Sequence, residues 1–534
     1  MEKYTVGVDF GTLSARAVIV SNETGKIVSS SEYSYPHGVM TESLPGGAPL
    51  GENFALQHPK DYVAALGATV KAAVKESGIN PENINGIGTD FTSCTMLPID
   101  QAGKPLCLKE EFMNEPHAYA KLWKHHGAEK EAEKITALAK ERGEKWLRLY
   151  GGKVSSEWML PKIAETLSSS PKVYDAADEF IEAADYLTLV LTGNKVKSSC
   201  MAGYKALWQK SGGYPDGEFM ATIDPRLRDL VKTKLKYPVA PCGSLAGEIS
   251  EEGARLTGLL PGTKVAVPII DAHSALPAAG IAEDGKLMCI IGTSSCHIIM
   301  DRKTKVLPGI CGAVEDGIIE GYTAYECGQA AVGDIFSWFM KNSLPESICG
   351  EARKSGKSVF ALMAEKAEKV PAGSNGITVL DWWNGNRTPY ADYLLTGVMA
   401  GLKLTTRPEE IYRAILEATA FGTRRILKLY EDGKIKVREV YASGGIAEKD
   451  AFLMQIYADV LGREIKVPVG SYAASRGSAV LAAYAAGNFS SPAEAASVMA
   501  DKEFKRYIPD MKKTAEYEVP YKKYLELSDY FLGL

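Results

Sequence analysis

The sequence predicts an α/β protein built from two domains, each with a mixed sheet flanked by helices. The first reason is size, because 534 residues, 46% of them hydrophobic, exceed what a single hydrophobic core organises. The second is that short apolar runs of strand length alternate with longer segments of helical periodicity. The third is that two apolar runs joined by a Gly-Thr turn occur near the N-terminus and again at Lys286–Met300.

The first pair of apolar runs spans Tyr4–Asp9 and Ala15–Val20, with Gly11 and Thr12 in the turn between them. Short runs of apolar and small residues bounded by turn residues are typical of strands. We therefore expect a hairpin here, at the edge of a sheet.

A helix is predicted to begin at Pro59, because proline suits the first turn and apolar residues then recur at four-residue spacing. Gly78 ends this helix. The strand Ile84–Thr89 follows and places Asp90 at its carboxyl end. Strand pair, helix and strand together indicate α/β architecture.

The second half of the chain repeats this theme. Thr406–Glu409 is a capping box with a proline in the first turn, and the helix that it opens is expected to close at Gly433. Strand Val440–Ser443 leads through two glycines into a helix at Asp450–Leu461. We predict domains at 1–283 and 284–534, with a peripheral helical tail after Asn488.

Composition and charge narrow the classes of function. With 61 Lys and Arg against 66 Asp and Glu, the net charge is -5, and no long block of one sign occurs. This balance favours neither nucleic acid nor a membrane as a partner. The chain shows no signal-peptide pattern, no run of 18 apolar residues and no paired or zinc-like cysteine spacing. We expect a cytoplasmic protein with free thiols, whose oligomeric state the sequence leaves open, a homodimer included.

The turn after the first strand has residues suited to phosphate. Asp9, Gly11, Thr12, Ser14 and Arg16 lie within the segment DFGTLSAR. Glycine lets the backbone approach a ligand, and hydroxyl and amide groups can hold anionic oxygens. An aspartate at a strand end is suited to hold Mg²⁺ beside a polyphosphate. The segment lacks the Gly-Lys-Ser/Thr of a P-loop, and by itself it is equally typical of an ordinary hairpin turn.

A second turn carries Gly292, Thr293 and Ser294, and two such hairpins facing each other could grip one nucleotide from both sides. Gly444 and Gly445 add backbone without side chains, against which a base or ribose could lie. Alone, this glycine pair is also typical of helix–strand packing.

In this order, DFGTLSAR, IGTSSC and ASGGIAEK resemble the two phosphate motifs and the adenosine motif of the actin-like ATPase superfamily. GIGTD and SRGSAVLAAYAAG resemble its connecting segments. Within the superfamily, SSEWMLPK, ADYLTLVLTG and WNGNRTPYAD resemble the FGGY carbohydrate kinases, and the resemblance covers essentially the whole chain. Five blocks in matching order, among them EFMNEPHAYAKLWKHH and ECGQAAVGDIFSWF, resemble the L-ribulokinase group of that family.

This resemblance implies two actin-like (ribonuclease H-like) domains with the active site in the cleft between them. It implies phosphorylation of a ketopentose by ATP with Mg²⁺, and for the L-ribulokinase group the conversion of L-ribulose to L-ribulose 5-phosphate in L-arabinose catabolism. The N-terminal domain would mainly bind the sugar, the C-terminal domain ATP, and Asp9 the metal. The implied nucleotide-binding residues are Gly11, Thr12, Ser14, Arg16, Gly292, Thr293, Ser294, Gly444 and Gly445.

The resemblance also implies which residues serve the sugar and the catalysis. Asp271 matches the family's catalytic aspartate, the general base, although an aspartate in this position could also cap a helix start. Ser93, Lys205 and Glu326 are implied to contact the sugar together with Asp271. His273 is expected to be a hydrogen-bonded structural residue. Further candidates for the wall of the cleft are Trp123, Lys124 and Trp158.

Three alternatives stay open. Another kinase of the family, such as a D-ribulokinase or a xylulokinase, would share every nucleotide motif and differ around Ser93, Lys205 and Glu326. A non-catalytic sugar sensor would be expected to have lost Asp9 or Asp271, and both are present. A chaperone-like or filament-forming ATPase would keep the nucleotide motifs but has no use for the sugar-kinase blocks.

Overall fold

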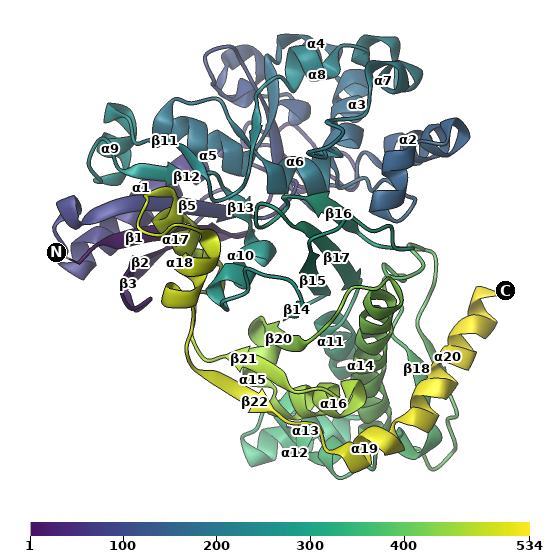
Figure 1. The fold of residues 1–534 in the computed structure, drawn as a ribbon. Coiled ribbons are helices and arrows are strands. Elements are labelled where there is room, and N and C mark those ends of the chain that lie inside the picture. Colours follow the sequence, from purple (N-terminus) through teal and green to yellow (C-terminus); the bar gives the residue numbers. More distant parts are fainter. Residues whose placement is uncertain (1, 534) are drawn as a thin grey trace.

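The computed structural model describes residues 2–533 and contains two large sheets flanked by helices (Figure 1). The strands of the first sheet are β1 (Tyr4–Phe10), β2 (Ser14–Ser21), β3 (Ile27–Ser34), β5 (Ile84–Phe91), β11 (Leu245–Glu248), β12 (Lys264–Ala266) and β13 (Ile269–Ile270). They lie in the order β11-β12-β5-β1-β2-β3, and β13 also pairs with β5. This sheet underlies the first half of the chain.

The second sheet belongs to the later part of the chain. Its strands are β14 (Lys286–Ile291), β15 (Ser295–Asp301), β16 (Gly312–Glu315), β17 (Thr323–Gln329), β20 (Glu439–Ser443), β21 (Ile465–Pro468) and β22 (Phe504–Tyr507). They lie in the order β16-β17-β15-β14-β20-β21-β22.

Both sheets have the same pattern at their centres. In the first, β5 runs parallel to β1, and β2 and β3 follow as antiparallel strands. In the second, β20 runs parallel to β14, and β15 and β17 follow as antiparallel strands. The recurrence predicted from the two Gly-Thr turns is therefore confirmed. The prediction that the first hairpin lies at a sheet edge is wrong, because β3 pairs with β2 along its length.

Smaller sheets and the helices complete the fold. One sheet, in the order β4-β7-β6-β8, is built from β4 (Leu56–Gln57), β6 (Met96–Ile99), β7 (Ala120–Lys121) and β8 (Glu179–Glu182), and two further pairs are β9 (Lys197–Ser198) with β10 (Val239–Ala240) and β18 (Thr378–Leu380) with β19 (Val398–Ala400). The helices up to residue 278 are α1 (Pro59–Ser77), α2 (Glu129–Arg142), α3 (Met159–Ser169), α4 (Pro171–Ala176), α5 (Ala183–Thr192), α6 (Ser199–Ala206), α7 (Gly217–Ile223), α8 (Leu230–Lys234), α9 (Glu251–Thr257) and α10 (Asp271–Ala278). Those after it are α11 (Gly333–Asn342), α12 (Glu346–Ser355), α13 (Val359–Glu368), α14 (Pro408–Asp432), α15 (Gly445–Lys449), α16 (Ala451–Leu461), α17 (Ala473–Ala485), α18 (Pro492–Met499), α19 (Met511–Glu516) and α20 (Glu518–Leu532).

Helix α1 begins and ends where the sequence predicts. Pro59 lies in its first turn, and Gly78 ends it with a left-handed φ of 66°. Tyr62 packs edge-on against Phe91 of β5, with 5.0 Å between the ring centroids. Helix α1 therefore covers one face of the first sheet.

Helix α14 begins one residue later than the predicted capping box. Its N-cap is Arg407, whose backbone N–H donates to Glu410 Oε2 at 2.7 Å. The Thr406 hydroxyl instead accepts from the backbone N–H of Lys403 at 2.8 Å, so it stabilises the preceding turn. The helix itself is confirmed and runs to Asp432, next to the predicted stop at Gly433.

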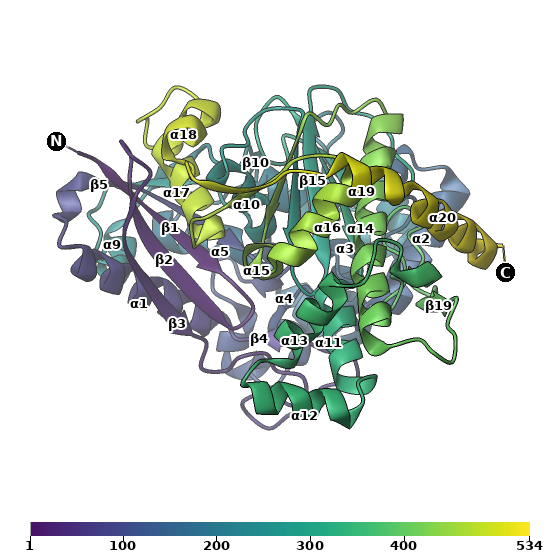
Figure 2. The same ribbon diagram turned by 90° about the horizontal axis from the view of Figure 1, so that it is seen from below.

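The other face of the first sheet is covered by α17, which comes from much later in the chain. A Cβ added to Gly7 of β1 would lie 1.7 Å from the carbonyl oxygen of Ser475, so only glycine allows this approach. Thr5 Oγ1 donates to the carbonyl oxygen of Ala479 at 3.0 Å. Figure 2 shows α17 and α18 beside β1, away from the rest of the C-terminal half. Helix α17 thus packs against the first sheet and α18 against α17 and α10, although the predicted division assigns both helices to 284–534.

The second sheet contributes to two hydrophobic cores, because successive side chains of a strand point to opposite faces. Ile299 of β15 packs in the core that includes α14 and α16. Its neighbours Ile298 and Met300 belong to the core of the N-terminal half. The two halves of the chain are therefore joined through continuous apolar packing.

The chain ends in α19 and α20, which follow β22 of the second sheet, and one face of these helices is buried. Tyr517 and Tyr524 are fully buried in the core of the C-terminal half. All nine cysteines are free thiols. Within residues 2–533, no helix combines the length and the apolar character that crossing a bilayer requires.

Candidate active site

Three aspartates from adjacent strands meet at one edge of the first sheet. Asp9 of β1 lies opposite Asp90 of the parallel strand β5. Strand β13 runs beside the end of β5, and the residue that follows it, Asp271, begins α10. Ligands of α/β sheets bind at the carboxyl ends of parallel strands, so this edge is a candidate site.

The three aspartates at this edge outnumber the basic side chain beside them, Arg16. Burial, and then the charge of Asp9, raises the pKa of Asp271 to about 7. Burial and the neighbouring Asp9 hold the pKa of Asp90 well above its usual range, although Ser478 Oγ donates to its Oδ2 at 2.6 Å. Burial also raises the pKa of Asp9, against a hydrogen bond with Asp90 and the charge of Arg16 at 3.6 Å. Carboxyl groups with raised pKa values would be stabilised as carboxylates by a cation.

A cavity of about 500 Å³ opens beside these carboxyl groups and is lined from both halves of the chain. Its lining includes Asp9, Gly11, Arg16 and Asp271 from the first half and Ser443, Gly444, Glu448 and Tyr472 from the second. The structure therefore brings the first predicted turn and Gly444 together around one space.

In each predicted phosphate turn the glycine N–H donates to a carbonyl oxygen within the turn, three residues on in the first turn and two residues on in the second. Gly11 N–H donates to the carbonyl oxygen of Ser14 at 3.0 Å, and Gly292 N–H donates to that of Ser294 at 2.9 Å. The second turn is held further, because the carbonyl oxygen of Thr293 accepts from Val332 N–H at 2.7 Å. Each turn thus holds its glycine in a fixed position at the end of a strand.

A second cavity, of about 650 Å³, adjoins the second turn. Its lining includes Gly292, Thr293, Phe336, Phe360, Tyr412, Gly445 and Lys449. A largely apolar cavity with aromatic side chains and a few polar groups is suited to a flat heterocycle such as a nucleotide base. Gly444 has φ 99°, and a Cβ there would lie 2.6 Å from the carbonyl oxygen of Ile291, so this position requires glycine.

The side chains of the first turn have other partners as well. Ser14 Oγ donates to Glu32 Oε1 at 2.8 Å, and Arg16 Nη2 donates to the same oxygen at 3.0 Å. Arg16 lines the first cavity, whereas the buried Ser14 does not. Thr12 Oγ1 accepts from the indole N–H of Trp123 at 3.3 Å. Ser14 thus supports the guanidinium group through a shared carboxylate.

Lys205 and Glu326 lie together in a pocket between the two halves, with Trp158 in its wall. Burial raises the pKa of Glu326, but Lys205 and His273 outweigh it and bring this pKa down to about 2. Burial lowers the pKa of Lys205, but Glu326 and Glu157 keep it above its usual value. Both side chains are therefore charged and can bind the hydroxyl groups of a sugar.

Sequence reasoning missed three charged residues of this pocket, Lys153, Glu157 and Arg387. Glu157 and Arg387 stand in segments that supported the family resemblance, SSEWMLPK and WNGNRTPYAD, so the available signal was a charged residue inside such a block. The predicted Ser93 follows β5 and is partly exposed, and it is not among the residues that line this pocket. Lys124 is partly buried, and it too is not part of the lining.

His273 is buried and hydrogen-bonded at both ring nitrogens. Its Nε2 lies 2.8 Å from Glu326 Oε2, and its Nδ1 lies 3.1 Å from Cys200 Sγ. An ionised carboxylate only accepts, so Nε2 carries the proton and donates to Glu326. Burial raises the pKa of the Cys200 thiol well above its usual range, so this thiol donates to Nδ1. The expectation of a hydrogen-bonded structural histidine agrees with these contacts.

Another group of possible metal ligands, His37, His58 and Asp61, lies at the start of α1. Both oxygens of Asp61 accept hydrogen bonds from His37, at 2.8 Å from its ring and 3.0 Å from its backbone N–H. His58 Nδ1 accepts from the backbone N–H of Lys60 at 3.2 Å. These atoms already cap the helix and fix the loop before it.

The family model for the N-terminal domain of the FGGY family of carbohydrate kinases matches residues 4–277, and the model for the C-terminal domain matches residues 287–486. Among curated proteins, the chain is 47% identical over 535 residues to a ribulokinase of Geobacillus thermodenitrificans, covering 99% of this chain and 95% of that protein. It is 42% identical over 531 residues to a ribulokinase of Mycolicibacterium smegmatis, covering 99% of this chain and 94% of that protein.

Solved structures of sugar kinases have the same fold. A xylulose kinase from Rhodospirillum rubrum matches with a TM-score of 0.80 at 21% identity, over 99% of this chain and 100% of that one. A Plasmodium falciparum glycerol kinase solved with ADP matches with a TM-score of 0.77 at 19% identity, over 98% of both chains. The predicted fold class, an actin-like α/β fold with helices on both sides of its sheets, is confirmed.

Proposed function

Because the chain belongs to the FGGY family of carbohydrate kinases, we propose that it transfers the γ-phosphoryl group of ATP to L-ribulose, giving L-ribulose 5-phosphate and ADP. Relatives that cover nearly the whole chain at 40 to 47% identity are ribulokinases, which supports a pentulose as the acceptor. The residues that carry this reaction are proposed from the geometry of the site.

The observation that carries the proposal is the position of Asp271. It lines the cavity that contains Asp9 and Gly444, and the charges of Lys205 and Glu326 also act on its carboxyl group. A single carboxylate thus lies between the proposed phosphate site and the proposed sugar pocket. This is where a base must lie to take the proton of a hydroxyl group that attacks phosphorus.

In the proposed mechanism, Lys205 and Glu326 bind hydroxyl groups of the pentulose and turn its terminal hydroxyl toward Asp271. Asp271 orients this hydroxyl for in-line attack and accepts its proton as the new bond forms. Its raised pKa brings the carboxyl group closer to the working pH, which favours proton transfer. Backbone amides of the turns at Gly11 and Gly292 are proposed to hold the phosphate chain.

Magnesium fits the carboxyl groups at the sheet edge. Asp9 and Asp271 line one cavity, both have raised pKa values, and carboxylate oxygens are the ligands that Mg²⁺ prefers. We propose that Asp9 holds the ion, directly or through water. Bound there, Mg²⁺ would neutralise charge on the phosphate oxygens.

We further propose that residues 1–283 mainly bind the sugar and residues 284–534 mainly bind ATP. Closing the cleft over the sugar would exclude water, which also attacks phosphorus, so ATP hydrolysis without sugar should be slow. Free thiols and a need for ATP fit the reducing cytoplasm, where we place the enzyme. A homodimer remains an open part of the proposal.

The test is an assay of ADP release with Mg-ATP across L-ribulose, D-ribulose, D-xylulose, L-xylulose, ribitol and glycerol. We expect the highest kcat/KM on L-ribulose and its loss in Asp271→Asn. A preference for D-ribulose or D-xylulose would retain the kinase and change the substrate. No turnover of any sugar, with ATP binding intact, would point to a sensor, and hydrolysis equally fast without sugar would point to an ATPase of another kind.

A further inference from the structure

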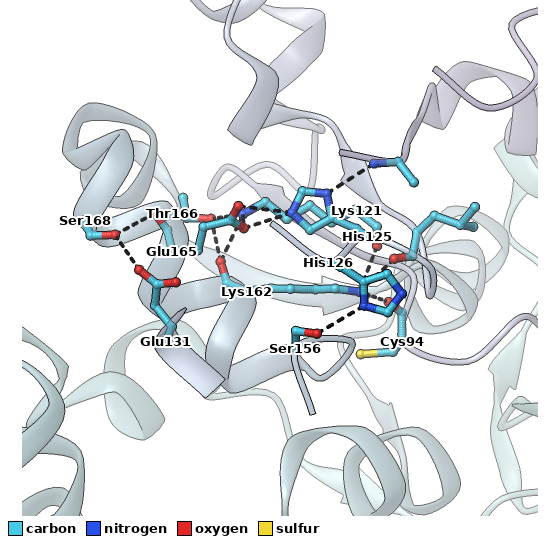
Figure 3. Close-up of polar contacts among 12 residues, drawn as sticks. Cys94, Lys121, His125, His126, Glu131, Ser156, Lys162, Glu165, Thr166 and Ser168 are labelled. Carbon is cyan, nitrogen blue, oxygen red and sulfur yellow. Dashed lines mark hydrogen bonds and ion pairs between the residues drawn. The ribbon is translucent and has the colours of Figure 1, made fainter. Parts of the chain in front are cut away.

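A cluster of buried polar side chains lies in the N-terminal half, where β7, the segment after it and α3 come together (Figure 3). We call Lys121, His125, Lys162 and Glu165 the Lys162 cluster. Lys162 and His125 have 0% exposed area, Lys121 1% and Glu165 3%. Lysine is almost never fully buried without partners, so two buried lysines in one cluster require an explanation.

The two lysines have different partners. Lys121 Nζ forms an ion pair with Glu165 at 2.6 Å, and Glu165 also contacts His125 Nε2 at 3.0 Å. Lys162 Nζ instead donates to the main chain, to the carbonyl oxygens of Cys94 at 2.7 Å, Leu122 at 2.8 Å and Lys121 at 3.4 Å. An ammonium group has three protons, and here all three are directed at main-chain carbonyls.

One of these carbonyls belongs to a residue with an unfavourable backbone conformation. Cys94 has φ 59°, in the left-handed region that residues other than glycine rarely adopt. Such a conformation is retained only where surrounding contacts stabilise it. The charge-assisted hydrogen bond from Lys162 to the Cys94 carbonyl is such a contact.

The Cys94 loop is linked through Lys162 to the segment that carries Trp158, in the wall of the proposed sugar pocket. The charges of Lys205 and Glu157, both in the pocket lining, act on the Cys94 thiol. Ser93, the implied sugar contact, is the preceding residue. Lys162 also lies one helical turn after Trp158, whose carbonyl accepts from Lys162 N–H at 3.3 Å and whose side chain lines the pocket.

The second short hydrogen bond of Lys162, to the carbonyl oxygen of Leu122, connects it with the first predicted phosphate turn. Leu122 precedes Trp123, whose indole N–H donates to Thr12 Oγ1 in the first turn. Lys162 therefore connects the loop at Cys94, the segment before Trp123 and helix α3, three segments that adjoin the proposed sites.

We propose that Lys162 is a positioning residue for the pentulose: its ammonium group holds the main chain at Cys94 in the left-handed conformation and so fixes the loop that carries Ser93, the sugar contact implied by the family resemblance. The inference rests on the proposed function and adds to it a residue that determines sugar binding without touching the sugar. Lys121 and Glu165 form the neighbouring ion pair, His125 contacts Glu165, and none of the three shares this role.

The experiment compares Lys162→Met, Cys94→Gly and the double variant with the wild type. We expect Lys162→Met to raise KM for L-ribulose by about ten-fold or more, with KM for ATP within about two-fold, since a charge-assisted hydrogen bond is lost. Adding Cys94→Gly should recover most of the loss, because glycine adopts a positive φ without steric strain. If the role of Lys162 were only structural, Cys94→Gly would not restore KM for L-ribulose, since the double variant also lacks a buried thiol.

Lys121→Met is the matched control, because it removes the other buried lysine and leaves the bond to Cys94. It should lower the melting temperature and leave KM for L-ribulose within about two-fold of the wild type. If Lys162→Met does not fold, Lys162→Arg, which keeps the charge but changes the donor geometry, serves instead and should show the same rescue. An unchanged KM in the folded Lys162 variant, or a double variant no better than the single one, would overturn the inference.

Failure of the inference is distinguishable from failure of the proposed function. A wild type that phosphorylates no pentulose contradicts the function. A wild type that is active, beside Lys162 variants with unchanged sugar KM, contradicts only the positioning role. The shift in melting temperature caused by L-ribulose gives a second readout, and we expect it to be reduced in Lys162→Met and recovered with Cys94→Gly.

Discussion

The imidazole of His273 lies 2.8 Å from the carboxylate of Glu326, and the two residues come from different halves of the chain. His273 belongs to α10, which begins with Asp271, and Glu326 belongs to β17 of the second sheet. One hydrogen bond thus couples the proposed base helix to the proposed sugar carboxylate. The thiol of Cys200, at 3.1 Å from Nδ1, fixes the ring in the orientation that this bond requires.

We expect His273→Asn to raise KM for L-ribulose by about five-fold, as the loss of one hydrogen bond to a charged group suggests. His273 is one of the groups that hold the pKa of Glu326 at about 2, so this pKa should rise in the variant. KM should then increase more in the variant than in the wild type on going from about pH 7 to about pH 5. Cys200→Ser, which keeps a donor to Nδ1, is the control and should resemble the wild type.

The pKa of Asp271, raised to about 7 by burial and by Asp9, predicts an acid limb in the pH profile. The base must be ionised, and kcat/KM reports the pKa values of the free enzyme, so kcat/KM should fall as the pH drops through about 7, toward ten-fold per pH unit. Asp271→Asn should lose about 10²- to 10⁴-fold in kcat and retain binding of the sugar. A kcat/KM that stays constant from about pH 5 to about pH 8 would contradict the assignment of Asp271 as base.

The sequence predicts correctly those strand and helix ends that are determined by residues close by in the chain. Asp9 and Asp90 were expected at strand ends because an apolar run precedes each of them, and Gly78 was expected to end α1 because it follows the helical stripe. The hairpin's place in the sheet was missed because β3 (Ile27–Ser34) alternates less clearly in polarity. The predicted N-cap of α14, Thr406, lies one residue before the observed N-cap, Arg407. The Thr406 hydroxyl accepts from the backbone N–H of Lys403 and does not cap the helix.

Features that depend on distant parts of the chain could not be predicted in this way. Arg387 lines the proposed sugar pocket with Glu157 and Lys205, yet nothing near Arg387 in the sequence indicates where these partners lie. Likewise, Gly7 reads as an ordinary strand residue until α17 is seen to approach it. The Cys94 conformation depends on Lys162, and local sequence does not predict a left-handed cysteine.

Gly444 and Gly445, which follow β20, allow a comparison of a position that requires glycine with a neighbouring one that does not. Gly444 has φ 99° and its Cβ would lie 2.6 Å from Ile291 O, whereas nothing lies within 4 Å of a Cβ at Gly445. Gly444→Ala should therefore lower the free energy of unfolding by about 2 kcal/mol or more, and Gly445→Ala by less than about 0.5 kcal/mol. Urea unfolding without nucleotide measures both. Equal losses in the two variants would show that the strain at Gly444 is not decisive.

The buried face of the C-terminal helices gives the last prediction. Tyr517 OH accepts from Arg413 Nη2 at 2.6 Å and donates to Glu417 Oε1 at 3.1 Å, and all three residues are buried. Tyr517→Phe keeps the ring but leaves a guanidinium N–H without its partner, which should reduce the free energy of unfolding by about 1 to 3 kcal/mol. Tyr530→Phe, at a side chain that is 62% exposed, is the control and should change it by less than about 0.5 kcal/mol. The midpoint of the first urea transition is the measurement. If both variants unfold like the wild type, apolar contacts alone hold the C-terminal helices in place. The ion pair between Arg413 and Glu417 then does not require the Tyr517 hydroxyl.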